Sequence, residues 1–242
     1  MEPGWERWES YFYPETYDPE ERLGVLRNMF DERDSTVLRF LEYDATRHRM
    51  REIDRGVVSI PQTYDLDHLR GIHRHLFQDV YGWAGEIRDV RIRKNEDSEF
   101  ARPREIPTMV EEVHEFISGV SWQTIDRRSF VNSIATTFAF LNQVHPFREG
   151  NGRTGQAFLR DVAAQSPFQL DYSQISRDLW NNASAMSSPR GDRRLPDPRP
   201  LLPLFHAATK PDVVPNARRP RTTMDTGPVT SGYDGNRGPE LH

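Results

Sequence analysis

Apolar residues recur every three or four positions over most of the chain, the spacing that buries one face of an α-helix. The clearest case is Asp65–Val80, whose stripe consists of Leu66, Leu69, Ile72, His73, Leu76, Phe77 and Val80. The same spacing predicts helices over Ile106–Val120, Arg127–Val144 and Gly152–Gln165. The pattern therefore predicts a mainly α-helical fold.

Shorter or weaker signals predict further helices on both sides of this body. Asp18 and Pro19 are a typical cap and first helical residue, and they predict a helix that continues through Phe30. Asp34–Arg55 continues the helical pattern, with Val37, Phe40, Leu41 and Met50 as its apolar positions. Ser173–Ser187 predicts another helix, and Leu201–Ala208 is apolar enough to dock as a last short one.

One segment lacks a helical stripe. Residues 87–100 read IRDVRIRKNEDSEF, with a turn cluster at Asn95–Ser98. Runs of β-branched residues around such a cluster predict a β-hairpin, with strands near Val90–Arg93 and Glu99–Ala101. From composition alone, a surface loop that happens to pair is an equally good interpretation.

Composition changes near Met186, because 10 of the 18 prolines lie between Met186 and His242. Proline cannot continue a helix or a central strand, so we expect Lys210–His242 to be a disordered tail. The domain prediction is therefore one folded unit over residues 11–208 and a tail over residues 209–242.

Charge and cysteine content exclude several classes of function. The formal net charge of −5 gives no bulk basic field for gripping nucleic acid. The absence of cysteine excludes a disulfide framework, a thiolate metal site and a cysteine nucleophile. No apolar run suits a membrane span, and Met1–Ser10 has no signal-peptide core, so the expected location is the cytoplasm.

Candidate chemistry is concentrated in residues 145–153, which read HPFREGNGR between two predicted helices. Pro146 ends the first helix, and Gly150 and Gly152 bracket Asn151 with residues that tolerate left-handed backbone angles. Such a bend can aim successive backbone N–H groups into one concavity, and the next helix adds its positive N-terminal end. The segment therefore predicts a phosphate site.

The side chains in this bend favour the same interpretation. Arg153 opposes the dipole of the helix that it begins, and a bound anion would remove that conflict. Glu149 facing an anion requires a cation such as Mg²⁺ between them. His145 can accept a proton at neutral pH. Each feature alone is more often structural, but together they indicate nucleotide transfer onto a hydroxyl group.

The segment HPFREGNGR also resembles the signature of the Fic family, HPFx(D/E)GNGR, at every specified position. The surrounding stretches YGWAGEIR and FARP are similar to that family as well, and the resemblance covers roughly residues 11–208. It implies a helical bundle with a β-hairpin flap. The implied activity is transfer of AMP from ATP, with Mg²⁺, to a Ser, Thr or Tyr hydroxyl of a target protein.

The resemblance also implies a role for each residue of the motif. His145 would be the general base, and Glu149 would hold the Mg²⁺ that bridges the α- and β-phosphates. Gly150, Asn151 and Gly152 would form the anion hole, while Arg153 would hold the distal phosphates and Phe147 would anchor the loop. The hairpin would align the target by strand addition, through Val90, Arg91, Ile92, Arg93 and Phe100.

Two departures from the family pattern leave alternatives open. Many members carry a second arginine where this chain has Gln156, so Arg160 is a candidate to compensate, or the donor is different. A Fic-fold phosphate or phosphocholine transferase and an inactive docking module are the competing interpretations. The only Glu-Gly or Glu-Asn pair is Glu149-Gly150, so no self-inhibitory motif is present.

In lacking a self-inhibitory motif, the chain resembles the toxin class of the family. A separate small antitoxin inhibits members of that class with its own helix. The resemblance then implies bacterial type II topoisomerase subunits as targets, and a host-directed effector is the alternative. We expect no membrane partner and no direct contact with nucleic acid.

Other polar residues have structural interpretations. His73 and His75 face different sides of one helix, so we do not expect them to share a metal. A basic strip near the hairpin, which solvent is expected to cover, consists of Arg88, Arg91, Arg93 and Lys94.

Overall fold

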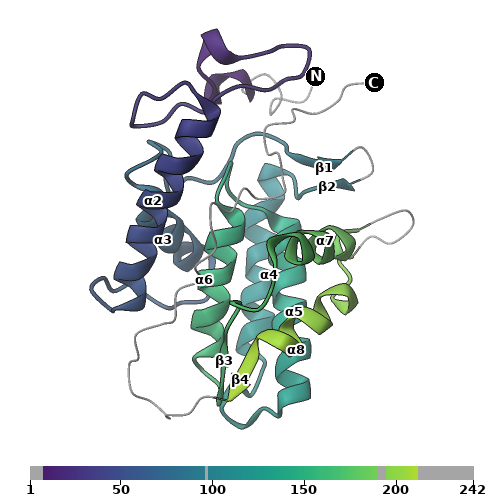
Figure 1. Ribbon diagram of the computed structural model, residues 1–242. Helices are drawn as coiled ribbons and strands as arrows, with labels where there is room; N and C mark the ends of the chain where they lie inside the picture. Colours follow the sequence, from purple (N-terminus) through teal and green to yellow (C-terminus); the bar gives the residue numbers. More distant parts are fainter. Residues whose placement is uncertain (1–7, 96–97, 190–194, 212–242) are drawn as a thin grey trace.

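The computed structural model describes residues 8–95, 98–189 and 195–211, and its architecture is mainly helical (Figure 1). Its α-helices are α2 (Ser35–Asp54), α3 (Leu66–Phe77), α4 (Ile106–Ser118), α5 (Arg127–Val144), α6 (Asn151–Ala163), α7 (Arg177–Ser187) and α8 (Leu202–Ala208). Two small antiparallel sheets accompany them, β1 (Arg93–Asn95) with β2 (Ser98–Glu99) and β3 (Phe168–Leu170) with β4 (Thr209–Pro211). Short 3₁₀ turns lie at Trp8–Tyr11, Pro14–Thr16, Pro103–Glu105, Trp122–Thr124 and Arg199–Leu201.

The core is built around α5 and α6, which pack against each other in the middle of the molecule (Figure 1). Helix α4 covers α5, and α3 lies between α6 and α2. Asp126 caps α5 by accepting hydrogen bonds from the N–H groups of Arg128 and Ser129, as a good N-cap residue does. The strongly periodic segments of the sequence are therefore confirmed as helices.

The helix predicted from Pro19 to Phe30 is wrong. Asp18 does cap a turn, because its carboxylate accepts from the N–H groups of Glu20 at 2.8 Å and Glu21 at 3.2 Å. The chain then reverses, since Arg22 has a left-handed φ of 54° and Leu23 pairs back onto Asp18. The capping signal was genuine, but it closes one turn rather than opening a helix.

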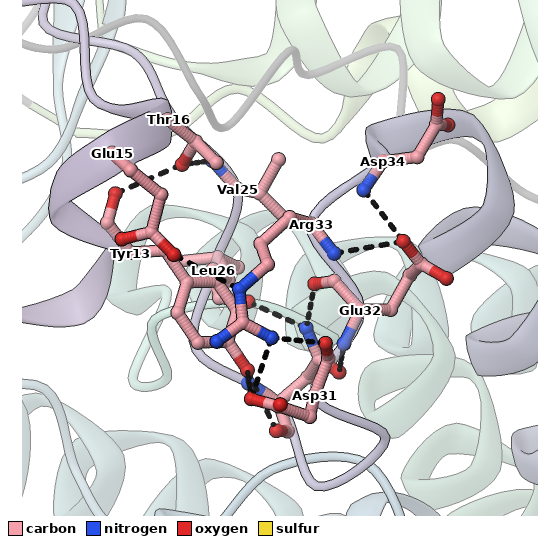
Figure 2. A network of polar contacts seen from close by, with 10 residues as sticks. Tyr13, Glu15, Thr16, Val25, Leu26, Asp31, Glu32, Arg33 and Asp34 are labelled. Carbon is pink, nitrogen blue, oxygen red and sulfur yellow. Dashed lines mark hydrogen bonds and ion pairs between the residues drawn. The ribbon is translucent and has the colours of Figure 1, made fainter.

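Polar side chains hold the chain in place between this turn and α2 (Figure 2). The guanidinium of Arg33 lies 4.2 Å from the centre of the Tyr13 ring and donates to Glu15 at 2.9 Å. Asp31, at a left-handed φ of 58°, forms an ion pair with Arg33 at 2.6 Å. These contacts join the N-terminal segment to the start of α2.

Helix α2 has the predicted extent, and Met50 packs against the core as predicted, but Val37 and Phe40 do not lie on its buried face. Val37 and Phe40 are 43% and 63% exposed, whereas Leu38 and Ile53 are buried. The side that α2 turns inward is therefore set by its contact with α3 and not by its most apolar positions.

The predicted boundaries of the domain also need correction. The Trp8 side chain is fully buried, so the folded unit begins before residue 11. Thr209–Pro211 forms β4 against β3, so the tail does not start at residue 209 or at Lys210. The rest of the predicted tail, residues 212–242, lies outside the residues that the structure describes.

The hairpin between α3 and α4 is confirmed, with shorter and shifted strands. Pairing joins Arg93 to Glu99 and Asn95 to Ser98, and the Phe100 N–H donates to the Ile92 carbonyl at 3.2 Å. Ala101 then donates its N–H to the Gln143 carbonyl near the end of α5. The hairpin is thus attached to the helix that leads into residues 145–153.

In the described part of the chain, no helix is both long and apolar enough to cross a membrane.

Candidate active site

Residues 145–150 form a tight bend between α5 and α6. His145 ends α5 with φ 46° and ψ 62°, and Gly150 begins α6 with φ 80°. The Asn151 side chain closes the bend, because its Oδ1 accepts from the Phe147 N–H at 2.9 Å and its Nδ2 donates to the Phe147 carbonyl at 2.8 Å. Phe147 is fully buried, as the anchoring role requires. Asn151 therefore shapes the bend through its side chain.

The two glycines of the bend have different surroundings. A Cβ on Gly150 would lie 2.3 Å from the Phe77 ring, so packing and its positive φ both require glycine. A Cβ on Gly152 would meet nothing within 4 Å. The first turn of α6 thus has open space beside its backbone, where unpaired N–H groups and the helix dipole favour an anion. This is the geometry expected of the predicted phosphate site.

The imidazole of His145 rests on the hairpin. Its ring stacks on Phe100, with centroids 3.8 Å apart and planes within 15°. Its Nδ1 atom is buried, so a reacting group would have to approach the other ring nitrogen, Nε2. His145 is only half-buried, so a ligand beside the bend can approach the ring. The predicted base and the predicted flap are therefore in direct contact.

Glu149 is a carboxylate with too little positive charge around it. Burial raises its pKa, and the Glu42 carboxylate raises it further, while Arg153 partly offsets both effects. The Gly150 N–H donates to its Oε1 at 2.9 Å. Two neighbouring carboxylates of this kind are suited to a hard divalent cation, which takes oxygen ligands. Glu149 would be the protein residue to hold the predicted Mg²⁺, since one carboxylate together with phosphate oxygens can hold this ion.

Arg153 is held by α2. It forms an ion pair with Glu42, donates to Thr46 Oγ1 at 3.0 Å, and lies with its guanidinium 4.7 Å from the centre of the Phe77 ring. Burial lowers the pKa of Arg153, but the Glu42 and Glu149 carboxylates outweigh it and the net shift is upward. The Tyr81 hydroxyl also donates to Glu42. No pattern in the sequence pointed to Glu42, which lies far from the motif along the chain.

His73 holds the main chain at Glu149 in place through its buried imidazole ring. Its ring stacks on Phe147 with centroids 3.9 Å apart. Its Nδ1 accepts from the Gly85 N–H at 2.8 Å, so the proton is assigned to Nε2, which donates to the Glu149 carbonyl at 3.0 Å. Burial lowers the pKa of His73 to about 3, so the ring is neutral at physiological pH.

His75 points elsewhere, with its Nε2 3.1 Å from the Glu52 carboxylate, so the two imidazoles have different neighbours. Among the residues that the structure describes, no group of three or more His, Cys, Asp and Glu side chains could hold a metal ion.

Two more arginines near the bend are buried. Arg148 is 2% exposed and lies with its guanidinium 4.1 Å from the centre of the Trp8 ring. Arg88 is also 2% exposed, so the expectation that solvent covers it is wrong. Both owe their positions to contacts far along the chain, which a local basic strip cannot reveal.

The predicted flap residues divide into buried anchors and partly buried positions. The side chains of Val90, Ile92 and Phe100 are buried beneath the hairpin. Arg91 forms an ion pair with Glu99 across the hairpin, and Arg93 begins β1 and is half-buried. Strand addition uses backbone groups, so the docking role of this segment stays a prediction.

Arg160 is not placed to replace the missing second arginine. Its guanidinium lies 3.2 Å from the buried Asp54 carboxylate of α2, within hydrogen-bonding distance of Met50 as well. The residue therefore joins α6 to α2, and the expected compensation for Gln156 is not what the structure shows.

Comparisons with known proteins match the part of the chain that contains this bend. A sequence model described as the Fic/DOC family matches residues 63–162. The protein adenylyltransferase VbhT of Bartonella schoenbuchensis is 33% identical over 171 residues, which cover 70% of this chain and 35% of that protein. The chain therefore spans about a third of that relative. The probable protein adenylyltransferase Fic of Escherichia coli is 30% identical over 190 residues, which cover 76% of this chain and 86% of that protein.

A solved structure shares the fold. It is the N-terminal Fic domain of a putative cell filamentation protein of Bartonella quintana with bound ADP. It superposes with a TM-score of 0.73 at 23% identity and covers 85% of this chain and 96% of that one. At this identity the likeness concerns the arrangement of the helices and the hairpin.

Proposed function

The chain belongs to the Fic/DOC family, and we propose that it is a protein adenylyltransferase that moves AMP from Mg–ATP to a Ser, Thr or Tyr hydroxyl of another protein. The observation that carries the proposal is the bend itself, which places His145, Glu149, the open first turn of α6 and Arg153 within nine residues. Relatives named protein adenylyltransferase, at 30% and 33% identity, support the same activity.

Each residue of the bend has one task in this reaction. The target hydroxyl oxygen bonds to the α-phosphorus as His145 takes its proton at Nε2, and the bond from the α-phosphorus to the bridging oxygen breaks. Pyrophosphate leaves. The N–H groups at the start of α6 and Arg153 stabilise the charge on the phosphate oxygens, which is the largest contribution in such transfers. When bound at Glu149, Mg²⁺ supplies charge neutralisation of the phosphates.

Two measurements test this proposal against its competitors. Titration calorimetry should show magnesium-dependent binding of ATP, whereas a pure docking module would bind none. Intact mass of a modified target should then show the addition of AMP. Addition of phosphate or phosphocholine instead would establish another transfer, the alternative that Gln156 and the engaged Arg160 favour.

We further propose that the protein acts as the toxin of a toxin–antitoxin pair. Support comes from the 242 residues themselves, in which the only Glu-Gly or Glu-Asn pair lies inside the motif. A separate small antitoxin would then supply the inhibitory helix, and bacterial type II topoisomerase subunits in the cytoplasm would be targets. Incubation of a purified topoisomerase subunit with the protein and labelled ATP tests this target. A subunit that stays unlabelled would exclude topoisomerase as the target. A host protein is the second candidate.

A further inference from the structure

We infer that Arg88 is a positioning residue for the transfer step, because it holds the main chain of His145 and both ends of the hairpin as one unit. This inference rests on the proposed function. Arg88 lies outside the motif, in the segment that enters β1, and it touches no reacting group in the proposed mechanism.

The contacts of Arg88 define that unit. Its Nε donates to the His145 carbonyl at 2.7 Å, and one terminal nitrogen donates to the Val144 carbonyl at 3.1 Å and also to the Ala101 carbonyl. The other terminal nitrogen donates to the Val90 carbonyl at 2.8 Å. The Arg88 N–H donates to the Pro146 carbonyl at 3.0 Å. One residue thus joins the end of α5, the start of the bend and both sides of the hairpin.

The burial of Arg88 shows that this arrangement is specific. The side chain is 2% exposed, and within the described residues its four side-chain hydrogen bonds all go to main-chain carbonyl oxygens. A buried cation without a carboxylate partner is costly. The carbonyl groups at the C-terminal end of α5 offset part of that cost, since they form the negative end of the helix dipole. Burial lowers the pKa of Arg88 to about 10, so the group is still charged at neutral pH.

These contacts set the orientation of the imidazole. His145 has a left-handed backbone, which a non-glycine residue adopts only when its surroundings enforce it. Arg88 binds the carbonyl of His145 and that of Pro146 next to it. It also binds the carbonyl of Ala101, the residue after Phe100, and the imidazole stacks on the Phe100 ring. Losing Arg88 would therefore misplace the base relative to the hairpin.

The nucleotide half of the site has separate supports. His73 holds the Glu149 carbonyl, Asn151 closes the bend, and Glu42 with Thr46 holds Arg153. None of these contacts passes through Arg88. A change at Arg88 should therefore affect transfer more than nucleotide binding.

The test compares Arg88→Lys with the wild-type protein. Lysine keeps the charge but has no planar fork, so it cannot bind carbonyl groups on three segments at once. Transfer from α-labelled ATP to proteins of a bacterial lysate should fall by about 10²-fold, the usual result of misplacing a reacting group by about 1 Å. The Kd for Mg–ATP should change by less than about twofold, a split that a general structural defect would not produce.

Arg127→Lys is the matched control, because Arg127 also donates to main-chain carbonyl groups, those of His206 and Thr209, but at the opposite end of α5. Its transfer rate should stay near that of the wild type. Normal transfer by a folded Arg88→Lys protein would overturn the inference, and so would equal losses of transfer and ATP binding. If the wild type itself transfers nothing, the proposed function fails instead.

Hydrogen exchange of the wild type gives a test that needs no variant and no target. If Arg88 couples the segments, the amides of Arg88, Phe100, Ala101 and His145 should open together with one free energy. Hairpin amides that exchange far faster than the His145 amide would overturn the inference.

Discussion

Buried polar side chains keep the bend at 145–150 in shape by donating to and accepting from its main chain. His73 binds the Glu149 carbonyl, Asn151 binds both main-chain groups of Phe147, and Arg88 binds the carbonyl of His145. Each such group would cost free energy if it lost its partner in the interior. The reacting geometry is therefore fixed before any ligand arrives.

The two glycines of the bend should respond differently to alanine. Gly150→Ala places a Cβ in the Phe77 ring at a positive φ, so we expect a loss of about 2–4 kcal/mol in the free energy of unfolding. Gly152→Ala meets no atom within 4 Å and should keep the stability of the wild type, but it should weaken Mg–ATP binding by occupying the open space. Urea denaturation and calorimetry measure the two effects. Unchanged ATP affinity in Gly152→Ala would place the nucleotide elsewhere.

Glu149 should reduce the stability of the protein when no cation is bound. Its folded pKa is raised, so ionisation in the folded state is unfavourable, and the resulting loss of stability grows as pH rises from its ordinary value of 4.5 through the folded value. In the presence of a chelator, Glu149→Gln should therefore melt at a higher temperature than the wild type at neutral pH. The difference should shrink as the pH falls toward 4.5. A difference that does not depend on pH would contradict this account.

At this scale the sequence located the chemistry but not its supports. His145, Glu149 and Arg153 lie within nine residues, so one short pattern reveals all three. Glu42, His73 and Arg88 reach the same site from distant positions, and their neighbours along the chain did not reveal these contacts. Only the folded backbone brings them together.

At the scale of elements, α2 and the N-terminal segment are part of the site. Helix α2 supplies Glu42 and Thr46 to Arg153, and the N-terminal segment supplies the Trp8 ring to Arg148. Arg148 lies within the bend, and Arg153 follows it in the first turn of α6. Elements outside the motif thus hold both of its arginines.

Removing the Trp8 ring should test this support. Trp8→Ala deletes a fully buried side chain, so the free energy of unfolding should fall by about 3–5 kcal/mol. The loss should also leave Arg148 buried without the ring that it covers, and ATP binding should weaken. Phe40→Ala, at an exposed position of α2, should cost less than about 0.5 kcal/mol. Urea denaturation of both variants measures these losses. Equal losses of unfolding free energy in Trp8→Ala and Phe40→Ala would contradict the supporting role of Trp8.

The success of sequence prediction at this scale followed the strength of the periodic signal. Helices α3, α4, α5 and α6 each carry a long apolar stripe and a cap or proline at one end, so few other structures fit them. The turn at Asp18 shares the capping signal but not the stripe, and local backbone pairing of Asp18 with Leu23 decided its form. The β3–β4 pair escaped prediction because its three-residue strands are far apart in the sequence.

On the scale of the whole molecule, the folded unit is larger than the family signature. The family model matches residues 63–162, whereas the structure extends the core from Trp8 to β4. Strand β3 follows α6 and β4 follows α8, so their pairing joins the chain after α6 to the chain after α8. Variants outside residues 63–162 can therefore affect the proposed reaction.

The central claim is that the bend between α5 and α6 transfers the AMP part of ATP with His145 as the base. The most direct test incubates the wild type and His145→Ala with a bacterial lysate and ATP labelled at either the α- or the γ-phosphate. We predict label on a protein from α-labelled ATP only, and at least about 10²-fold less with His145→Ala, since a general base contributes about 10²–10⁴-fold. Label from γ-labelled ATP, or equal labelling by a folded His145→Ala protein, would contradict the claim.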